Sequence, residues 1–139
     1  MIIRILIISI LLFMKSNVLA NTKFFNEGVN LFNDNKLKEA KFKFEQDLVY
    51  NPKNEKSYLY LSKIFKNFKK KDLVEQNLKT VILLNPKNEE AIYNLAKIKL
   101  EASDYKRSKE LNKKLIIICD KFCEKSRNLK NEIEALSKK

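Results

Sequence analysis

The sequence predicts an all-α fold, an α-α superhelix of helix-turn-helix repeats with about seven helices after an N-terminal export segment. Three observations predict it. The segment Asn51–Glu55 (NPKNE) recurs as Asn85–Glu89, 34 residues later. Apolar residues on both sides of these segments recur at helical spacing. The 139 residues include only one Gly and two Pro, too few for the many tight turns of a β fold.

The composition also excludes several kinds of chemistry. The chain has no His, so Ser-His-Asp and Cys-His nucleophile systems and His-ligated zinc are excluded. Two Cys cannot form a four-cysteine metal site, and one Gly excludes glycine-rich phosphate loops. We therefore expect no enzyme, no cofactor and no metal. The net charge of +12 is spread along the chain without interleaved aromatic residues, so we expect no nucleic-acid partner.

Residues 1–20 have the pattern of a secretory signal peptide. Arg4 supplies the positive region, and residues 5–14 form an apolar run. Val18 and Ala20 are small residues three and one before a cut, so we expect cleavage after Ala20. The protein would then be exported, to the periplasm in a two-membrane bacterium and otherwise into the medium, without stable membrane insertion.

A competing interpretation keeps this segment as a membrane anchor and uses a basic face of the protein on anionic lipid. A spanning helix needs about 18–20 apolar residues, and Lys15 interrupts this run. The first residue of the mature protein distinguishes the two interpretations, because Asn21 indicates cleavage and Met1 indicates an anchor.

The first predicted repeat covers residues 21–54. Phe24, Gly28 and Leu31 lie at helical spacing and precede a polar break at residues 33–36. A second apolar stripe follows at i, i+3, i+7 and i+11: Leu37, Ala40, Phe44 and Leu48. Proline at position 52 then ends the second helix, because it lacks the amide donor.

The same arrangement is predicted twice more, over residues 55–88 and 89–122. Gly28, Ser62 and Ala96 align as small residues, which let two helix backbones approach closely. The third copy is degenerate, with Asn112 and Asp120 at places that are aromatic and proline in the first. Residues 123–139 have a narrow apolar stripe of Leu129, Ile133 and Leu136, which predicts a helix that caps the open end of the array.

A 34-residue unit with Phe24, Gly28, Ala40, Phe44 and Pro52 in this order resembles the tetratricopeptide repeat (TPR) family, over about residues 21–122. The resemblance implies a protein-interaction scaffold in which the first helix of each repeat lines a concave groove for a peptide or a partner helix, here with a possible task in cell-envelope assembly. The family's groove-lining places fall on residues of the first helix in each repeat, and we predict ten of these residues to contact a partner. They are Phe25, Val29, Phe32, Lys56, Leu59, Lys63, Lys66, Tyr93, Asn94 and Lys97.

This predicted groove is apolar at its start and positive in its middle, so an acidic-apolar segment would complement it. The alternative is that its lysines form an ordinary solvated face and that Phe25 or Phe32 packs against a neighbouring element. A short array is also only marginally stable. We therefore expect weak self-association if Phe25 and Phe32 are exposed.

Cys119 and Cys123 lie four residues apart at the junction of the third repeat and the cap. Within a regular helix their Cβ atoms would be about 5–6 Å apart, and a disulfide needs about 3.5–4.5 Å. A turn at this junction would permit a disulfide that fastens the cap, as export favours. Two reduced thiols, or a metal or redox site, are the alternatives.

Overall fold

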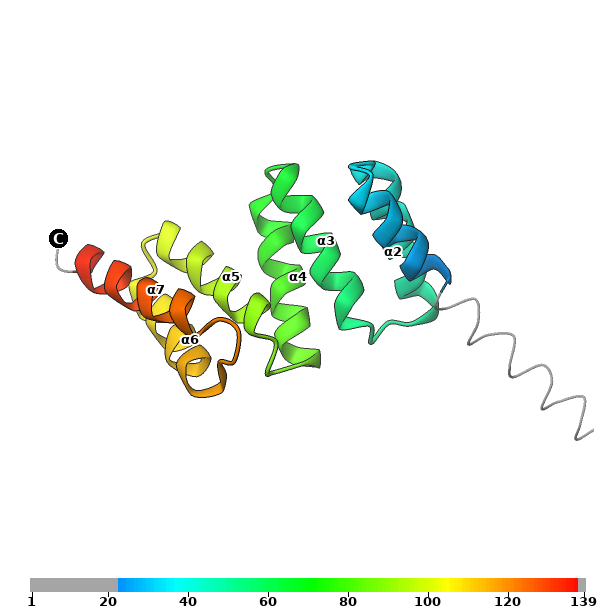
Figure 1. Cartoon of the computed structure of the whole chain (residues 1–139). Coiled ribbons are helices and arrows are strands. Elements are labelled where there is room, and N and C mark those ends of the chain that lie inside the picture. Colours follow the sequence, from blue (N-terminus) through cyan, green and yellow to red (C-terminus); the bar gives the residue numbers. More distant parts are fainter. Residues whose placement is uncertain (1–22, 138–139) are drawn as a thin grey trace, which may run out of the picture. The chain divides into compact units, whose positions relative to one another are not determined.

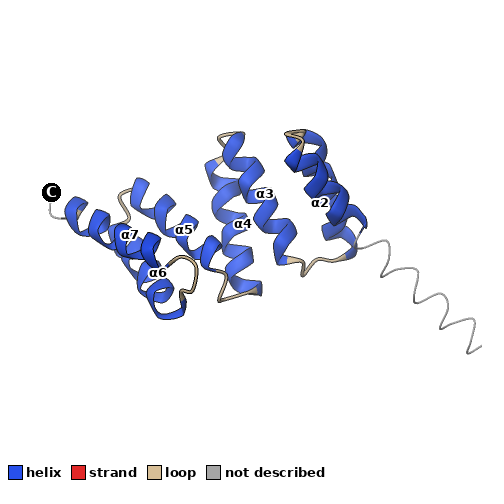
Figure 2. Cartoon of the chain, viewed as in Figure 1, coloured by secondary structure: helices blue, strands red, loops and turns tan. Residues whose placement is uncertain are grey.

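The computed structural model describes residues 23–137. These residues are helical apart from short turns, and no strand occurs among them (Figure 2), which confirms the predicted all-α class. The predicted signal segment, residues 1–20, lies outside the described residues.

The helices follow one another with short connections (Figure 1). After a helix over residues 23–33 come α2 (Leu37–Tyr50), α3 (Glu55–Asn67), α4 (Lys71–Leu84), α5 (Glu89–Glu101), α6 (Tyr105–Ile118) and α7 (Cys123–Leu136). The described residues form two compact units, residues 23–64 (unit 1) and residues 65–137 (unit 2).

The turn between the two helices of each hairpin uses one left-handed residue at the same place in the 34-residue register. These residues are Asn35 (φ 59°), Lys69 (φ 56°) and Ser103 (φ 58°). The next residue in each turn donates its N–H to a carbonyl five residues back, as Lys36 does to Leu31 at 2.8 Å. This hydrogen bond satisfies a free carbonyl at the C-terminus of the preceding helix. In many proteins the left-handed residue of such a turn is glycine.

Unit 1 is organised around Phe44 on α2. This side chain is completely buried, as is Ala40 one turn earlier. The chain's single glycine, Gly28, lies opposite Phe44, and a Cβ atom at Gly28 would be 2.8 Å from the Phe44 ring. The sequence therefore places glycine where a ring needs the space of a missing side chain, so that the first helix and α2 can approach closely.

Unit 2 is organised around α5, which contacts α4, α6 and α7. Its buried face contains Ile92, Leu95, Ala96 and Leu100. The side-chain hydroxyl of Ser108 on α6 donates to the backbone carbonyl of Ala96 at 2.8 Å, so the small residue at 96 brings the two helices close enough for a direct hydrogen bond. Leu129 and Ile133 of α7 are also buried, as expected for a capping helix.

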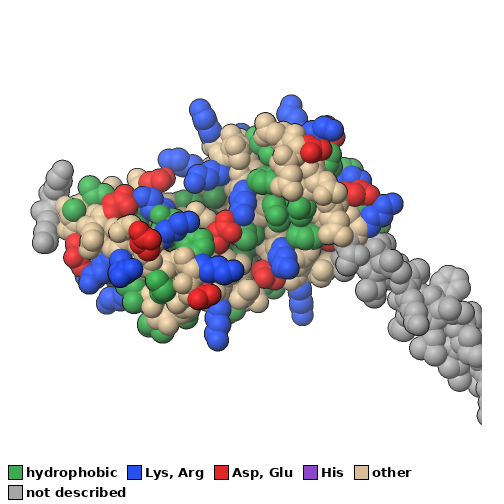
Figure 3. All heavy atoms as spheres, in the orientation of Figure 1, with side chains coloured by type: hydrophobic (Ala, Val, Ile, Leu, Met, Phe, Trp, Pro, Cys, Tyr) green, Lys and Arg blue, Asp and Glu red, His purple; other side chains and the backbone are tan. Residues whose placement is uncertain are grey.

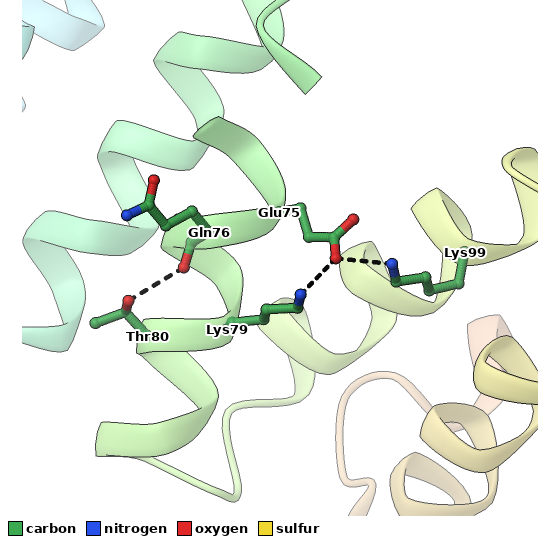
Figure 4. Close-up of polar contacts among 5 residues, drawn as sticks. All are labelled: Glu75, Gln76, Lys79, Thr80 and Lys99. Atoms are coloured by element: carbon green, nitrogen blue, oxygen red, sulfur yellow. Dashed lines mark hydrogen bonds and ion pairs between the residues drawn. The ribbon is translucent and has the colours of Figure 1, made fainter. Parts of the chain in front are cut away.

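One ion-pair network links α4 to α5 within unit 2 (Figure 4). The Glu75 carboxylate oxygen Oε1 lies 2.6 Å from Lys79 Nζ and 2.7 Å from Lys99 Nζ. Hydrogen bonds from the ammonium groups of Lys79 and then Lys99 hold the pKa of Glu75 below its ordinary value, against the opposing effect of burial. Only 24% of the Glu75 side chain and 18% of the Lys99 side chain are exposed, so solvent screens this pair less than an open surface pair.

Replacement of Glu75 by Gln is expected to lower the free energy of unfolding by about 0.5 kcal/mol at neutral pH. Because the pKa of Glu75 is lowered in the folded chain, its stabilisation is complete above the pKa of the unfolded chain and disappears as the pH falls through the folded value. Urea denaturation of both proteins between pH 7 and pH 3 measures this convergence. Glu134→Gln, which removes an exposed ion pair whose atoms are 4.0 Å apart, is the control and should change the free energy of unfolding little at pH 7. A Glu75→Gln deficit that persists at pH 3 would contradict the ionic origin.

Candidate functional site

Unit 1 places four aromatic side chains in contact around Tyr60 on α3. The Tyr60 ring stacks on Phe44 with centroids 4.8 Å apart. It makes edge-to-face contacts with Phe25 and Phe32, with centroids 5.9 and 5.2 Å apart. Such tilted and stacked pairs add to the free energy gained by burial. We call Phe25, Phe32, Phe44 and Tyr60 the Tyr60 cluster.

Both phenylalanines that were predicted to open the groove belong to this cluster. Phe25 also contacts Phe44, with centroids 5.9 Å apart, and both Phe25 and Phe32 are half-buried. Phe25 and Phe32 therefore pack against neighbouring helices, as the alternative interpretation of the sequence expected. The expectation of self-association rested on exposed phenylalanines, and neither residue is among the exposed large apolar side chains of the described chain.

The other predicted residues of unit 1 lie on the first helix and on α3. Val29 and Leu59 are half-buried, and Lys56 in the first turn of α3 is exposed. Lys63 is half-buried and holds its Nζ 5.2 Å from the centre of the Tyr60 ring, within the range of a cation–π contact. Unit 1 thus combines aliphatic and aromatic surface with positive charge on α3.

In unit 2 the predicted residues of α5 contact the capping helix. Tyr93 lies 5.6 Å from the ring of Phe122, the residue that immediately precedes α7. The Nζ of Lys125, in the first turn of α7, lies 4.4 Å from the Phe122 ring centre and 5.8 Å from that of Tyr93. The start of α7 therefore covers part of the α5 surface that was predicted to bind a partner.

Lys97 is engaged in the same contact between α5 and α7. Its Nζ lies 2.9 Å from each carboxylate oxygen of Glu132 on α7. The hydrogen bonds to Glu132 raise the pKa of Lys97, although burial opposes them. Because a carboxylate already compensates this ammonium group, Lys97 contributes less to attraction of an acidic partner than the sequence predicts. Of the remaining predicted residues, Asn94 is half-buried on α5 and Lys66 is exposed at the end of α3.

Glu89 fixes the turn between α6 and α7, at the end of unit 2 where α5 begins. Its carboxylate accepts hydrogen bonds from the backbone N–H groups of residues 120, 121 and 122 at 3.0, 3.1 and 2.8 Å. A disulfide joins Cys119 to Cys123 across the same three residues, with the Cα atoms 5.2 Å apart. Where the first two repeats have Asn-Pro at the end of the second helix, the third has this doubly constrained turn.

Replacement of Glu89 by Gln is expected to lower the free energy of unfolding by about 1–2 kcal/mol, because the amide group cannot present two charged acceptor oxygens to three donors. Thermal melts of the oxidised protein measure the loss. Glu90→Gln is a poor control because Glu90 has its own contact. Glu124→Gln, exposed beside the same turn, is the matched one. An equal loss in both variants would show that general charge, rather than the three hydrogen bonds, stabilises the turn.

Reduction of the disulfide should be separable from this effect. Opening a five-residue loop removes about 2 kcal/mol in the chain-entropy description. Cys119→Ser should therefore lower the free energy of unfolding by as much as a reductant does. Glu89→Gln should still be destabilising in the reduced protein.

Over residues 23–137, no group of His, Cys, Asp or Glu is placed to hold a metal ion. On the face drawn in Figure 3, Lys and Arg side chains are dispersed and alternate with acidic and apolar ones. No helix in the described part of the chain has the length and apolar character needed to cross a membrane.

Sequence reasoning missed four residues that shape these surfaces. Tyr60 was not among the predicted groove residues, yet it is the centre of the cluster in unit 1. Phe122, Lys125 and Glu132 contact the predicted residues of α5. The spacing of Lys125 and Glu132, seven residues apart, places both on one face of α7 and was the available signal. Nothing in the sequence indicates against which helix that face packs.

Comparison with solved structures shows that the chain has the fold of TPR domains. The first TPR of Spaghetti (RPAP3), bound to an HSP90 peptide, superposes with a TM-score of 0.72 at 15% identity, covering 84% of this chain and 93% of that one. SycD, a type III secretion chaperone of Yersinia enterocolitica, in complex with a peptide of the translocator YopD, gives a TM-score of 0.72 at 15% identity, covering 85% and 94%. The Sgt2 TPR domain of Aspergillus fumigatus gives 0.71 at 18% identity, covering 86% and 83%. No protein-family model matches the chain, and no curated protein matches it in sequence.

Proposed function

We propose that this chain is an exported, non-enzymatic scaffold that binds an acidic-apolar peptide or partner helix on unit 1. The surface consists of Val29, Lys56, Leu59 and Lys63 around the Tyr60 cluster. The observation that carries the proposal is the combination, on α3, of half-buried apolar side chains with an exposed lysine at residue 56. Two neighbours of the same fold hold peptides in their solved structures, which supports peptide binding as the general mode.

Unit 1 is favoured over α5 because α7 already contacts α5. Tyr93 packs on Phe122, and Lys97 pairs with Glu132. A partner on α5 would have to displace these contacts, whereas the aliphatic side chains of unit 1 keep part of their surface in solvent. Apolar contact would supply most of the affinity, and the lysines would select for acidic residues at the edge.

Binding of two synthetic peptides tests this proposal. Both carry the same leucines and phenylalanines, and their polar positions are Glu in one and Lys in the other. The acidic peptide should bind and the basic one should not, by fluorescence anisotropy at low salt. Lys56→Glu should lower the affinity for the acidic peptide by about tenfold. Lys97→Gln is the matched control and should leave its affinity unchanged. Equal binding of both peptides would overturn the proposal.

The proposed export is tested separately. The N-terminal residue of the protein isolated from its native cells should be Asn21, which follows the predicted cleavage site. We place the scaffold in the cell envelope on the same ground, in the periplasm where two membranes are present. Recovery of Met1 as the N-terminal residue would overturn the proposed cleavage and support a membrane anchor. It would leave the peptide-binding proposal intact.

A further inference from the structure

Three positions, 34 residues apart, hold a large aliphatic side chain in solvent. Val49, Leu83 and Ile117 are 78%, 80% and 82% exposed. Each is the penultimate residue of the second helix of its hairpin, α2, α4 or α6. A solvated aliphatic side chain gives nothing to the hydrophobic core. The third repeat keeps this feature although it has lost several residues that build the core in the first.

Each of these aliphatic residues is followed, four positions later, by an exposed lysine. The lysines are Lys53, Lys87 and Lys121. Every hairpin end therefore presents an aliphatic side chain and an ammonium group in the same order. We call these six residues the hairpin-end positions.

In unit 2, Glu89 brings two hairpin ends together. It begins α5 directly after the loop that contains Lys87, and its carboxylate binds the backbone of residues 120–122 in the loop that contains Lys121. The last turns of α4 and α6 consequently lie at the same end of the unit (Figure 1). Leu83 and Ile117 belong to these last turns, and the neighbouring Ile116 is 44% exposed.

In unit 1, the corresponding end lies beside the first described turn of the chain. Phe24, in the first described turn, stacks on Tyr50 with centroids 5.5 Å apart. Tyr50 follows Val49 directly and is 59% exposed.

We infer that the hairpin-end positions of unit 2, which are Leu83, Lys87, Ile117 and Lys121, are contacts with an anionic membrane surface. Aliphatic side chains enter the interfacial layer while adjacent lysines bind lipid phosphates, a combination typical of peripheral membrane binding. A protein partner or a second copy would need a contiguous complementary patch. Here single aliphatic side chains stand beside polar and charged residues, and each recurs with its own cation. The surface uses residues other than those of the proposed peptide-binding surface.

The chain contains no Trp, so single tryptophans in the full chain report this contact directly. Leu83→Trp and Ile117→Trp should shift their emission to the blue on vesicles of phosphatidylglycerol and phosphatidylcholine, and brominated lipid should quench them. Phe42→Trp is the control, because Phe42 is 57% exposed on α2 but its counterparts in the other repeats are Gln76 and Glu110. It should show neither change. Equal quenching at all three positions, or at none, would overturn the inference. So would a blue shift of Leu83→Trp and Ile117→Trp on concentrating the protein without lipid, which would indicate a second copy.

The lysines are tested by a second pair of full-chain variants, with circular dichroism as the check on folding. Lys87→Gln with Lys121→Gln should weaken partition into the anionic vesicles by about fivefold per lysine at low salt. Lys38→Gln with Lys109→Gln removes the same charge from exposed positions elsewhere and should change it far less. Equal weakening by the two double variants would show that net charge alone acts and would overturn the assignment of these lysines. None of these substitutions alters the peptide-binding residues, so either proposal can fail alone.

Discussion

Replacement of Phe44 by Ala is expected to lower the free energy of unfolding by about 3–5 kcal/mol, the largest loss expected from any single substitution in unit 1. The ring is fully buried, stacks on Tyr60 and fills the space that Gly28 leaves open. Its removal leaves a cavity that two helices cannot close without losing their other contacts. Urea denaturation followed by circular dichroism measures the change.

Phe42→Ala is the matched control, because this ring lies on the same helix and is 57% exposed. Its effect should stay within about 0.5 kcal/mol. Gly28→Ala tests the other side of the contact. Although alanine favours a helix by about 1 kcal/mol over glycine, the variant should be destabilised, because its Cβ would lie 2.8 Å from the ring. A stabilised Gly28→Ala protein would show that the first helix and α2 can separate at low cost.

Removal of the Ser57 hydroxyl should have the second large effect, a loss of about 1–3 kcal/mol. Asp47 is completely buried, and its Oδ2 accepts hydrogen bonds from Ser57 and from Asn54. Its Oδ1 is buried with no hydrogen-bond partner in the structure. Ser57→Ala would leave a buried carboxylate with a single donor. Thermal and urea denaturation at neutral pH check this value.

The second repeat supplies the compensating variant. Val81 and Ala91 stand there at the places of Asp47 and Ser57, and both are completely buried. Asp47→Val combined with Ser57→Ala should therefore restore the stability of the natural chain to within about 1 kcal/mol, because replacing both members of a buried polar pair is far less costly than replacing one. If the double variant were as unstable as Ser57→Ala, Asp47 would have to stabilise the fold by more than the hydrogen bonds that it accepts from Ser57 and Asn54.

The sequence was sufficient to predict the helices and their order because both depend on local signals. Apolar spacing identifies each helix, and the polar breaks and Asn-Pro segments identify its end. The buried residues Ala40 and Phe44 lie on the predicted stripe of the first repeat, and Leu129 and Ile133 lie on that of the cap. The degenerate third repeat is explained only by the structure. Asn112 is buried and exchanges two hydrogen bonds with Ser126 of α7, so its polar side chain suits a helix that meets a cap.

The surface proposed for a partner on unit 1 could be predicted only in part from the sequence. Repeat register places residues on a helix face, and Val29, Lys56 and Leu59 retain solvent exposure there. Register does not reveal which faces other elements cover. Phe25 and Phe32 gather at Tyr60 through contacts between helices, and Lys97 meets Glu132 across 35 residues of sequence. Such long-range pairs depend on how an amphipathic helix docks, which one sequence does not specify.

The left-handed turn residues have a consequence for how this chain can change. Lys69 and Ser103 adopt a left-handed conformation that costs such residues about 1–2 kcal/mol, whereas asparagine, as at Asn35, adopts it more readily. The chain's only glycine lies elsewhere, at the helix crossing. The protein is therefore less stable than its architecture permits. Glycine substitutions at the two distant positions 69 and 103 would each raise the stability, and their contributions should add. That added stability could offset costly changes elsewhere, so binding residues could diversify while the helical framework persists.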